Sequence, residues 1–221
     1  MNRGVNKMEK IKGIIFDLDG VLVFTDQYHY QAWKKMADDM GIYFDEVMNN
    51  RLRGVSRMES LDIILECYEG EPLDQEKKQK IAEEKNRIYC ELLKNMKPSD
   101  VSDEVRKTLI ELRRRGYKLS IGSSSKNAKS ILEQVELRDY FDAVSDGTNI
   151  TNSKPDPEVF LKAAEYLQLQ PEACAVVEDA YAGIDGAKTG MMVAIGIGDA
   201  AGYEKTDVSI KMFGDLLQVF K

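Results

Sequence analysis

Two aspartates directly behind a short apolar run carry the clearest chemical signal in this sequence. The run Ile14-Ile15-Phe16 is too short for a helix and is typical of a buried parallel strand, and Asp17 and Asp19 follow it. Both carboxylates therefore leave the carboxyl end of a strand, which is the edge where open α/β sheets bind ligands. Because neighbouring carboxylates repel each other, we expect Mg2+ between them, with one aspartate as nucleophile and the other as proton carrier. The plainer alternative is a strand that ends in an Asp-Gly turn.

Three further groups of polar residues follow later strand ends. Ser123-Ser124-Ser125-Lys126-Asn127 comes after the strand expected at 118–122 and opens a helix, so its free backbone N–H groups, hydroxyls and ammonium could bind an anion such as phosphate. On its own, such a serine run is explained equally well as a helix cap. Lys154 precedes a helix that begins with proline, and on its own it is typical of a solvated surface lysine. Glu178 and Asp179 end a buried strand at the same sheet edge and could complete the oxygen shell of a magnesium ion, or simply cap a helix.

The hydrophobic pattern predicts the elements that must position these residues. Residues 26–97 show helical periodicity only, with helices expected from Thr25 or Asp26 to Gly41, from Ser56 to Tyr68, and from Asp74 to about Met96 with Ile81, Ile88 and Leu92 on its inner face. From residue 98 onward strands and helices alternate, with strands expected at 118–122, 143–145, 175–177 and 192–195. This alternation predicts an α/β fold with a doubly wound parallel sheet. We therefore expect a core domain of residues 1–25 and 98–221 and an inserted helical cap domain of residues 26–97.

Composition sets the class of protein and of partner. A chain of 221 residues, 43% of them hydrophobic, can build a full core and is long enough for one large domain or for a domain with a sizeable insertion. Its net charge of -7 disfavours nucleic acid and anionic membranes as partners, so an anionic substrate needs a local basic pocket. The three cysteines are far apart and form no CxxC pair, which argues against a disulfide framework and a zinc site. This use of cysteine fits a reducing cytoplasm, and the pattern contains neither a signal core nor a membrane span. A monomer in the cytoplasm is expected.

The order of these motifs along the chain resembles the haloacid dehalogenase superfamily of phosphohydrolases and phosphotransferases. The resemblance covers nearly the whole chain and rests on residues 17–21, 123–127, 153–155 and 178–180. Two phrases in the helical block, at 28–33 and 53–57, are similar to the β-phosphoglucomutase family within that superfamily. Two positions depart from the pattern. Phe24 stands where many relatives carry Asp, and Arg53 stands where these mutases often have Lys, which keeps the charge but changes its geometry.

The resemblance implies a phosphoryl shuttle. Asp17 would accept the phosphoryl group as an aspartyl phosphate, and Asp19 would protonate or deprotonate the sugar oxygen. Ser123 and Lys154 would balance the charge of the transferring group. Mg2+ would be held by Asp17, the backbone carbonyl of Asp19, Glu178 and Asp179. The net reaction would interconvert β-D-glucose 1-phosphate and glucose 6-phosphate through β-glucose 1,6-bisphosphate.

Turnover of a bisphosphate requires a second phosphate site. The resemblance assigns it to Arg57 of the helical cap together with Ser125, Lys126 and Asn127 of the core, because a guanidinium fork matches phosphate oxygens. Closing the cap would also exclude water from the aspartyl phosphate. The remaining substrate contacts expected from the resemblance are Arg53, Gly54, Val55, Ser56, Ser60, Lys85 and Ser124. For Lys85 the solvated face of a charged helix is an adequate alternative explanation.

The single histidine, His29, lies one helical turn before Trp33, so the two side chains share a helix face. By itself such a pair is more often a packing feature. The resemblance implies instead that His29 couples closure of the cap to the orientation of Asp19 and that Trp33 contacts the sugar.

Two other functions remain open. A sugar-phosphate phosphatase would use the same aspartates and magnesium but would let water attack the aspartyl phosphate. A non-catalytic phosphosugar-binding protein could keep the fold, although it has no need for both a nucleophile and an acid/base partner. Only the phrases of the helical block separate the mutase from the phosphatase.

Overall fold

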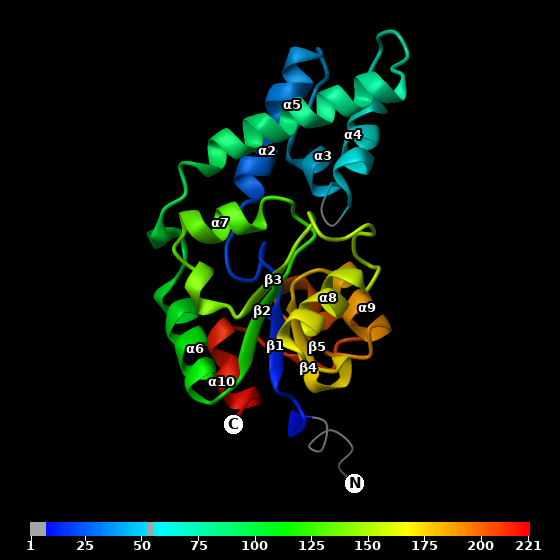
Figure 1. The fold of residues 1–221 in the computed structure, drawn as a ribbon. Helices are drawn as coiled ribbons and strands as arrows, with labels where there is room; N and C mark the ends of the chain where they lie inside the picture. Colours follow the sequence, from blue (N-terminus) through cyan, green and yellow to red (C-terminus); the bar gives the residue numbers. More distant parts are fainter. Residues whose placement is uncertain (1–7, 53–54) are drawn as a thin grey trace. The chain divides into compact units, whose positions relative to one another are not determined.

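The computed structural model describes residues 8–52 and 55–221, and a parallel β-sheet forms the centre of the unit made of residues 8–24 and 97–221 (Figure 1). In these ranges the sheet has six strands in the order β3-β2-β1-β4-β5-β6. The strands are β1 (Gly13–Phe16), β2 (Lys118–Gly122), β3 (Ala143–Ser145), β4 (Cys174–Glu178), β5 (Val193–Gly196) and β6 (Val208–Ser209). All neighbouring strands pair in parallel. Because β1 lies between β2 and β4, the carboxyl ends of these three strands meet at one edge.

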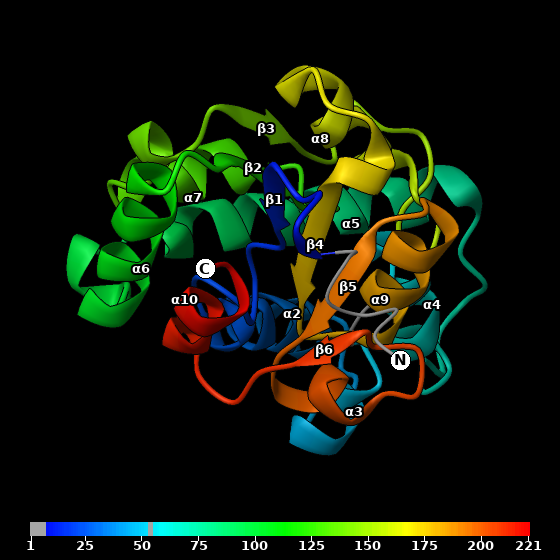
Figure 2. The same cartoon turned by 90° about the horizontal axis from the view of Figure 1, so that it is seen from below.

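Helices cover both faces of this sheet, which explains why β1, β4 and β5 consist almost entirely of apolar residues. They are α6 (Asp103–Arg114), α7 (Ala128–Gln134), α8 (Glu158–Leu167), α9 (Tyr181–Thr189) and α10 (Leu216–Val219). Helix α8 packs against β1, β2 and β3, α9 packs against β4 and β5, and α10 packs against α6. Figure 2 shows α8 and α9 on one side of the sheet and α6 and α10 on the other. The predicted doubly wound parallel sheet is confirmed.

The core under α8 and α9 is closely filled with small and branched side chains. Every residue of β1 and of β4 is buried. Helices α8 and α9 meet these strands through Val159, Phe160, Ala163, Ala164, Leu167, Ile184 and Ala187. This packing holds the sheet rigid, so side chains that leave the strand ends have well-defined positions.

The described chain divides into two compact units. The core unit contains the described residues up to Phe24 together with Lys97–Lys221, and the helical unit contains those of Thr25–Met96. The domain boundaries expected from the sequence remain a prediction, since compactness does not show that a unit folds alone.

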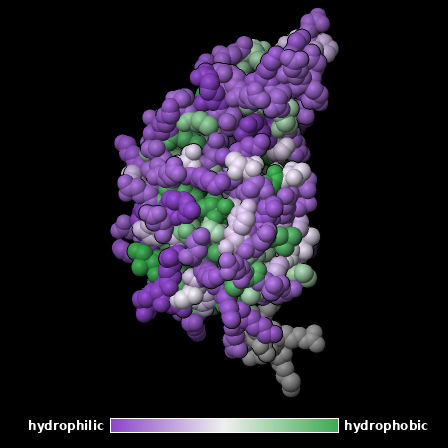
Figure 3. Space-filling view, in the orientation of Figure 1, coloured by the Kyte–Doolittle hydropathy of each residue, from purple (hydrophilic) through white to green (hydrophobic). Residues whose placement is uncertain are grey.

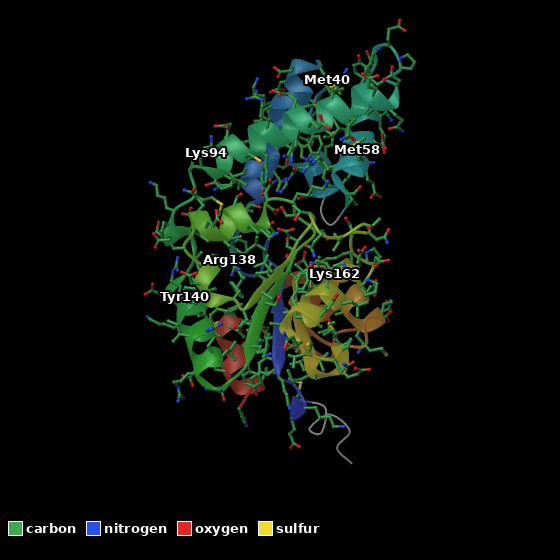
Figure 4. All side chains as sticks on the ribbon, in the orientation of Figure 1. Met40, Met58, Lys94, Arg138, Tyr140 and Lys162 are labelled. Carbon is green, nitrogen blue, oxygen red and sulfur yellow. The ribbon has the colours of Figure 1, made fainter. Side chains whose placement is uncertain are left out.

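The helical unit contains α2 (Asp26–Asp39), α3 (Glu46–Asn50), α4 (Arg57–Leu65) and α5 (Gln75–Leu93). Helix α5 packs against both α2 and α4. The core of the unit comprises Trp33, Met36, Ala37, Ile42, Phe44, Leu52, Leu61, Ile64 and Ala82. Met40 and Met58, which Figure 4 labels, are partly buried and pack against this core.

Side-chain caps set several helix starts where the sequence predicts them. Ser56 accepts a hydrogen bond from the Glu59 N–H at the start of α4, and Asp74 accepts one from the Lys77 N–H at the start of α5. Thr25 precedes α2 but makes no such cap. Its hydroxyl instead accepts a hydrogen bond of 3.1 Å from the Tyr89 hydroxyl, which ties the start of α2 to α5.

Some details of the helical unit differ from the prediction. Helix α4 ends at Leu65 rather than Tyr68. Helix α3 was not predicted, because it has no buried residue and therefore shows no apolar stripe in the sequence. The most deeply buried positions of α5 are Ala82, Lys85, Tyr89 and Leu93, while Ile81, Ile88 and Leu92 are only half-buried. The buried face of α5 is therefore rotated by one residue, about 100°, from the predicted face. The reason is that Lys85 and Tyr89 pack against aromatic side chains of α2.

The surface seen in Figure 3 is mainly hydrophilic, and hydrophobic residues appear on it in small separate groups. In the part of the chain that the structure describes, every helix is too short or too polar to cross a membrane.

Candidate active site at the carboxyl edge of the sheet

The segment after β1 places Asp17 at the centre of this edge. The Asp17 N–H donates a hydrogen bond of 3.0 Å to the Val177 carbonyl of β4, which continues the sheet by one residue. Asp17 is 7% exposed, Leu18 is fully buried and Asp19 is half-buried. Alternation along an extended segment thus turns Leu18 into the core and the two aspartates away from it.

Lys154 joins the strand ends of β1 and β4. Its ammonium lies 2.5 Å from Asp17 Oδ1 and 2.5 Å from Glu178 Oε1, and only 10% of its side chain is exposed. The ammonium also lies 4.9 Å from the centre of the Phe160 ring. The interpretation of Lys154 as a solvated surface lysine is therefore wrong, because the turn before α8 directs its side chain inward and not toward solvent.

One ammonium between two carboxylates leaves an excess of negative charge. Burial alone would lower the pKa of Lys154, but the carboxylates of Asp17 and Glu178 outweigh burial and raise it, so the cation persists. Burial and the neighbouring Glu178 raise the pKa of Asp17 despite the attraction of Lys154. Burial, with Glu178 as the next cause, raises the pKa of Asp179 to about 7. The negative charges of Asp17, Glu178 and Asp179 thus exceed the single positive charge of Lys154, and this cluster is suited to bind a further cation.

The donor set fits a hard divalent cation. Asp17, Glu178 and Asp179 each offer an oxygen, and these oxygens lie within 4.8 Å of one another. Clustered carboxylate oxygens are the ligands that Mg2+ prefers. Two glycines leave room for this cluster. A Cβ at Gly20, whose φ is 82°, would lie 2.0 Å from Asp179 Oδ2, and a Cβ at Gly183 would lie 2.0 Å from Glu178 Oε1. Gly20 belongs to the Asp-Leu-Asp-Gly motif that the sequence made prominent, whereas Gly183 was not predicted to matter.

Residues Ser123–Asn127, here called the anion loop, follow β2 at the same edge. Ser123 is buried, Ser124 and Ser125 are half-buried, and Lys126 is exposed. The N–H groups of Ser125 and Asn127 each donate a hydrogen bond of 3.2 Å, to the hydroxyls of Ser123 and Ser125 respectively. The Ser123 N–H donates a hydrogen bond of 3.1 Å to the Ser145 carbonyl. The expectation that these N–H groups are free is therefore wrong for three of them, because two are bonded to serine side chains that fold back onto the loop and one to β3. Helix α7 begins only at Ala128.

In the helical unit, α2 and α5 bring a second set of predicted residues together. The Lys85 ammonium lies 2.9 Å from His29 Nδ1. It also lies 4.5 Å from the centre of the Trp33 ring and 4.9 Å from that of Tyr89. The rings of His29 and Tyr89 stack with their centres 4.0 Å apart. Tyr89 was missed in the sequence, although its position four residues after Lys85 puts both on one face of α5.

Lys85 is a buried cation without a carboxylate partner. The residue is 2% exposed, and it forms no ion pair with any carboxylate in residues 8–52 and 55–221. Burial, and after it the charge of Arg57, lowers the pKa of Lys85 to about 7. Burial and the charges of Lys85 and Arg57 lower the pKa of His29. The explanation of Lys85 by a solvated helix face is wrong, because α5 turns this position toward the aromatic rings of α2.

Replacing Lys85 with methionine is expected to stabilise the protein by roughly 1–4 kcal/mol at pH 7, since an apolar chain of similar length avoids burying a charge. Unfolded Lys85 keeps its proton up to its ordinary pKa of 10.5, whereas folded Lys85 loses it above about 7. The unfolded state therefore binds more protons in this window, so the free energy of unfolding rises with pH, and Lys85→Met should remove that part of the rise. Urea unfolding at pH 7 and pH 9 measures both effects.

The matched control is Lys78→Met, because Lys78 is on the same helix but pairs with Asp62 at 2.7 Å near the surface. Stabilisation in the control equal to that of Lys85→Met would contradict this explanation.

The other predicted residues of the helical unit have varied surroundings. Arg57 Nη2 donates a hydrogen bond of 2.8 Å to Asn86 Oδ1 on α5, a partner that the sequence did not indicate. Ser60 is buried, Val55 is half-buried, and Ser56 is exposed and used as a helix cap. Two further predicted contacts, Arg53 and Gly54, lie outside the described residues.

An open surface depression lies elsewhere, along α8 and the turn before it. Its lining residues are Asn152, Asp156, Glu158, Leu161, Lys162 and Glu165, of which Figure 4 labels Lys162. None of them is a predicted site residue, and the mixture of acidic groups with one lysine does not match an anionic ligand.

Comparison with known proteins agrees with this geometry. A family model described as haloacid dehalogenase-like hydrolase matches residues 11–190. The chain belongs to the haloacid dehalogenase-like hydrolase family. It is therefore related to phosphatases and phosphotransferases, and its relatives include enzymes of both kinds.

Three haloacid dehalogenase-like relatives illustrate the activities that occur among similar proteins. The chain is 39% identical to a β-phosphoglucomutase of Bacillus subtilis over 207 residues, covering 93% of this chain and 92% of the relative. It is 32% identical to a phosphorylated carbohydrates phosphatase of Thermotoga maritima, covering 81% of each. A crystal structure of β-phosphoglucomutase from Clostridium difficile superposes with a TM-score of 0.85 at 35% identity, covering 95% of this chain and 97% of that one.

Proposed function

We propose that this protein is a Mg2+-dependent β-phosphoglucomutase that interconverts β-D-glucose 1-phosphate and glucose 6-phosphate through β-glucose 1,6-bisphosphate. The observation that carries the proposal is Lys85, a buried ammonium beside Trp33 that has no carboxylate partner in the described chain. A buried charge is costly unless something compensates it, and an anionic ligand would do so. The B. subtilis and C. difficile relatives support the same choice.

The core unit would carry the chemical steps. Asp17 would attack the phosphorus and hold the phosphoryl group as an aspartyl phosphate, while the bond to the sugar oxygen breaks. Asp19 would give that oxygen a proton and later take one from the hydroxyl that accepts the phosphoryl group. Lys154 and Ser123 would offset the charge of the transferring group. Mg2+ on Asp17, Asp19, Glu178 and Asp179 would supply Lewis-acid stabilisation of the phosphoryl oxygens.

The substrate would be bound by two further sets of residues. The anion loop would hold a phosphate through Ser124, Ser125, Lys126 and Asn127 in the core unit. In the helical unit, Arg57 and Lys85 would supply positive charge, and Trp33 would offer an apolar face to the sugar ring. His29, whose lowered pKa keeps it neutral, would accept a hydrogen bond from Lys85 and so orient that ammonium. Arg53, Gly54, Val55, Ser56 and Ser60 would complete these contacts.

A sugar-phosphate phosphatase is the second candidate, and the T. maritima relative favours it. The two activities share the nucleophile and differ in what accepts the phosphoryl group from Asp17. Incubation with β-D-glucose 1-phosphate, Mg2+ and a trace of β-glucose 1,6-bisphosphate separates them. The mutase forms glucose 6-phosphate as the main product, whereas predominant release of free phosphate would overturn the proposal in favour of the phosphatase.

Arg57→Ala tests the second phosphate site. The change removes a charge-assisted contact worth roughly 1.5–3 kcal/mol, so isomerisation should fall about ten- to a hundredfold. Hydrolysis of acetyl phosphate, a donor with a single phosphate, should stay within a few-fold. Both activities are measured side by side in the same preparation.

The control for this variant is Arg51→Ala. Arg51 belongs to the same unit but pairs at the surface with Glu66 at 2.7 Å, so its removal should leave both activities unchanged. An equal loss of isomerisation and acetyl phosphate hydrolysis in Arg57→Ala, or no loss of either, would rule out the distal-phosphate role.

A further inference from the structure

A turn that directly follows β3 carries a fully buried carboxylate outside the site described above. Asp146 is 0% exposed. Its Oδ1 accepts hydrogen bonds from the Thr148 N–H at 2.9 Å and the Thr148 hydroxyl at 2.5 Å. Its Oδ2 is also buried and accepts no hydrogen bond from any described residue. A buried carboxylate oxygen without a hydrogen bond is unfavourable for stability, which suggests that Asp146 has another role.

The cation that faces this oxygen comes from α7. The Lys129 ammonium lies 3.4 Å from Asp146 Oδ2 and donates a hydrogen bond of 3.5 Å to the Thr148 hydroxyl. Lys129 is in the first turn of α7, where the helix dipole disfavours a positive charge, so it does not serve the stability of the helix. Its side chain is 53% exposed. The Lys129 ammonium thus contacts Asp146 and Thr148, while about half of the side chain is open to solvent.

The same turn lies directly against the anion loop. The Gly147 N–H donates a hydrogen bond of 3.1 Å to the Ser125 carbonyl. A Cβ at Gly147 would lie 2.4 Å from the Ser124 carbonyl oxygen and 2.9 Å from the Lys126 nitrogen, so only glycine allows this approach. Asp146, one residue away, therefore anchors Lys129 beside the loop.

We propose that Asp146 is a positioning residue that holds the Lys129 ammonium beside the anion loop, where Lys129 adds to the positive charge that attracts the phosphate of the substrate. The identity of the substrate rests on the proposed function, but the attraction applies to any phosphate at this loop. A protein with a net charge of -7 repels anions at long range, so ammonium groups fixed near the loop matter for binding. Lys126 lies in the anion loop itself, so its charge would add to that of Lys129.

The experiment measures the affinity of the whole protein for inorganic phosphate, with Mg2+ present, from the shift in thermal unfolding temperature during titration. Lys129→Gln removes the ammonium, and Asp146→Asn keeps the shape and the acceptor for Thr148 but removes the charge. Each should weaken phosphate binding about two- to fivefold, as for a partly exposed charge contact. The losses should shrink in 0.5 M NaCl because salt screens exposed charges. The double variant should be no weaker than Lys129→Gln alone.

Lys107→Gln is the matched control, because Lys107 makes a similar pair of 3.3 Å with Asp103 on α6. It should leave phosphate affinity unchanged. Unchanged affinity in Lys129→Gln would overturn the proposal, and so would additive losses in the double variant. A lower unfolding temperature in Asp146→Asn with normal phosphate affinity would show a structural role only. Failure of the proposed function is distinguishable, since it would appear as absent isomerisation in a protein that still shows these phosphate effects.

Discussion

Asp17→Asn is expected to lower isomerisation and acetyl phosphate hydrolysis by roughly 10⁴-fold or more, as when a catalytic nucleophile is removed. An amide does not attack phosphorus, and the side chain would still fill the space at the end of β1. The fold should survive, because burial and Glu178 already disfavour the charge on Asp17. Lys154 would keep Glu178 as its remaining carboxylate partner at 2.5 Å.

Formation of glucose 6-phosphate and release of free phosphate both have to be measured, since mutase and phosphatase use the same nucleophile. Intact-protein mass spectrometry excludes deamidation of the asparagine and shows whether acetyl phosphate adds a phosphoryl group to the wild type alone. The control is Asp103→Asn, an exposed aspartate on α6 that should keep full activity. Turnover of a few per cent in protein free of deamidation would remove Asp17 from the role of nucleophile.

Asp19→Asn should lower isomerisation by ~10²–10⁴-fold, the usual contribution of a general acid and base. The turn that carries Asp19 is closed by the backbone, through hydrogen bonds from Gly20 N–H to the Val23 carbonyl at 2.8 Å and from Leu22 N–H to the Leu18 carbonyl at 3.0 Å. These bonds do not need the carboxylate, so the variant should fold normally. The backbone carbonyl proposed as a metal ligand is also retained.

The reaction with acetyl phosphate separates the role of Asp19 from that of Asp17. Acetate leaves readily without a proton from the enzyme, so phosphorylation of Asp17 by acetyl phosphate should persist in Asp19→Asn while transfer to and from sugar hydroxyls is lost. Stopped-flow or quenched measurements of the two half-reactions test this difference. Equal losses with both donors would assign Asp19 to metal binding or structure, and normal turnover with the sugar would place the proton carrier elsewhere.

Local patterns were enough to predict most of the core unit. The run Ile14-Ile15-Phe16 lies within β1, and the predicted strands at 118–122 and 143–145 match β2 and β3 residue for residue. Parallel strands under helices are buried on both faces, so β1 and most of β4 appear in the sequence as apolar runs. The two-residue strand β6 and the short helix α10 were not predicted, because elements of that length carry no period.

Side-chain environments were predicted less well than elements. The charged pattern around Lys85 is typical of an exposed helix, and only the packing of α5 against α2 shows that this lysine lies under Trp33 and Tyr89. Periodicity gives the spacing of a helix face, but a rotation of one residue changes which side chains are buried, and that rotation depends on the partner helix. Partners distant in sequence, such as Asn86 for Arg57, were missed for the same reason.

The sequence by itself determined the fold class, the strand ends and the types of residue placed there, because these follow from local patterns and from the rule that parallel strands present their carboxyl ends together. Only the tertiary structure decided that Lys154, 137 positions after Asp17, places one ammonium between Asp17 and Glu178. It also decided that Asp146 is buried in a turn that lies directly against the anion loop. Charge balance in a buried site depends on distances between side chains that are remote in the chain, and no local pattern contains those distances.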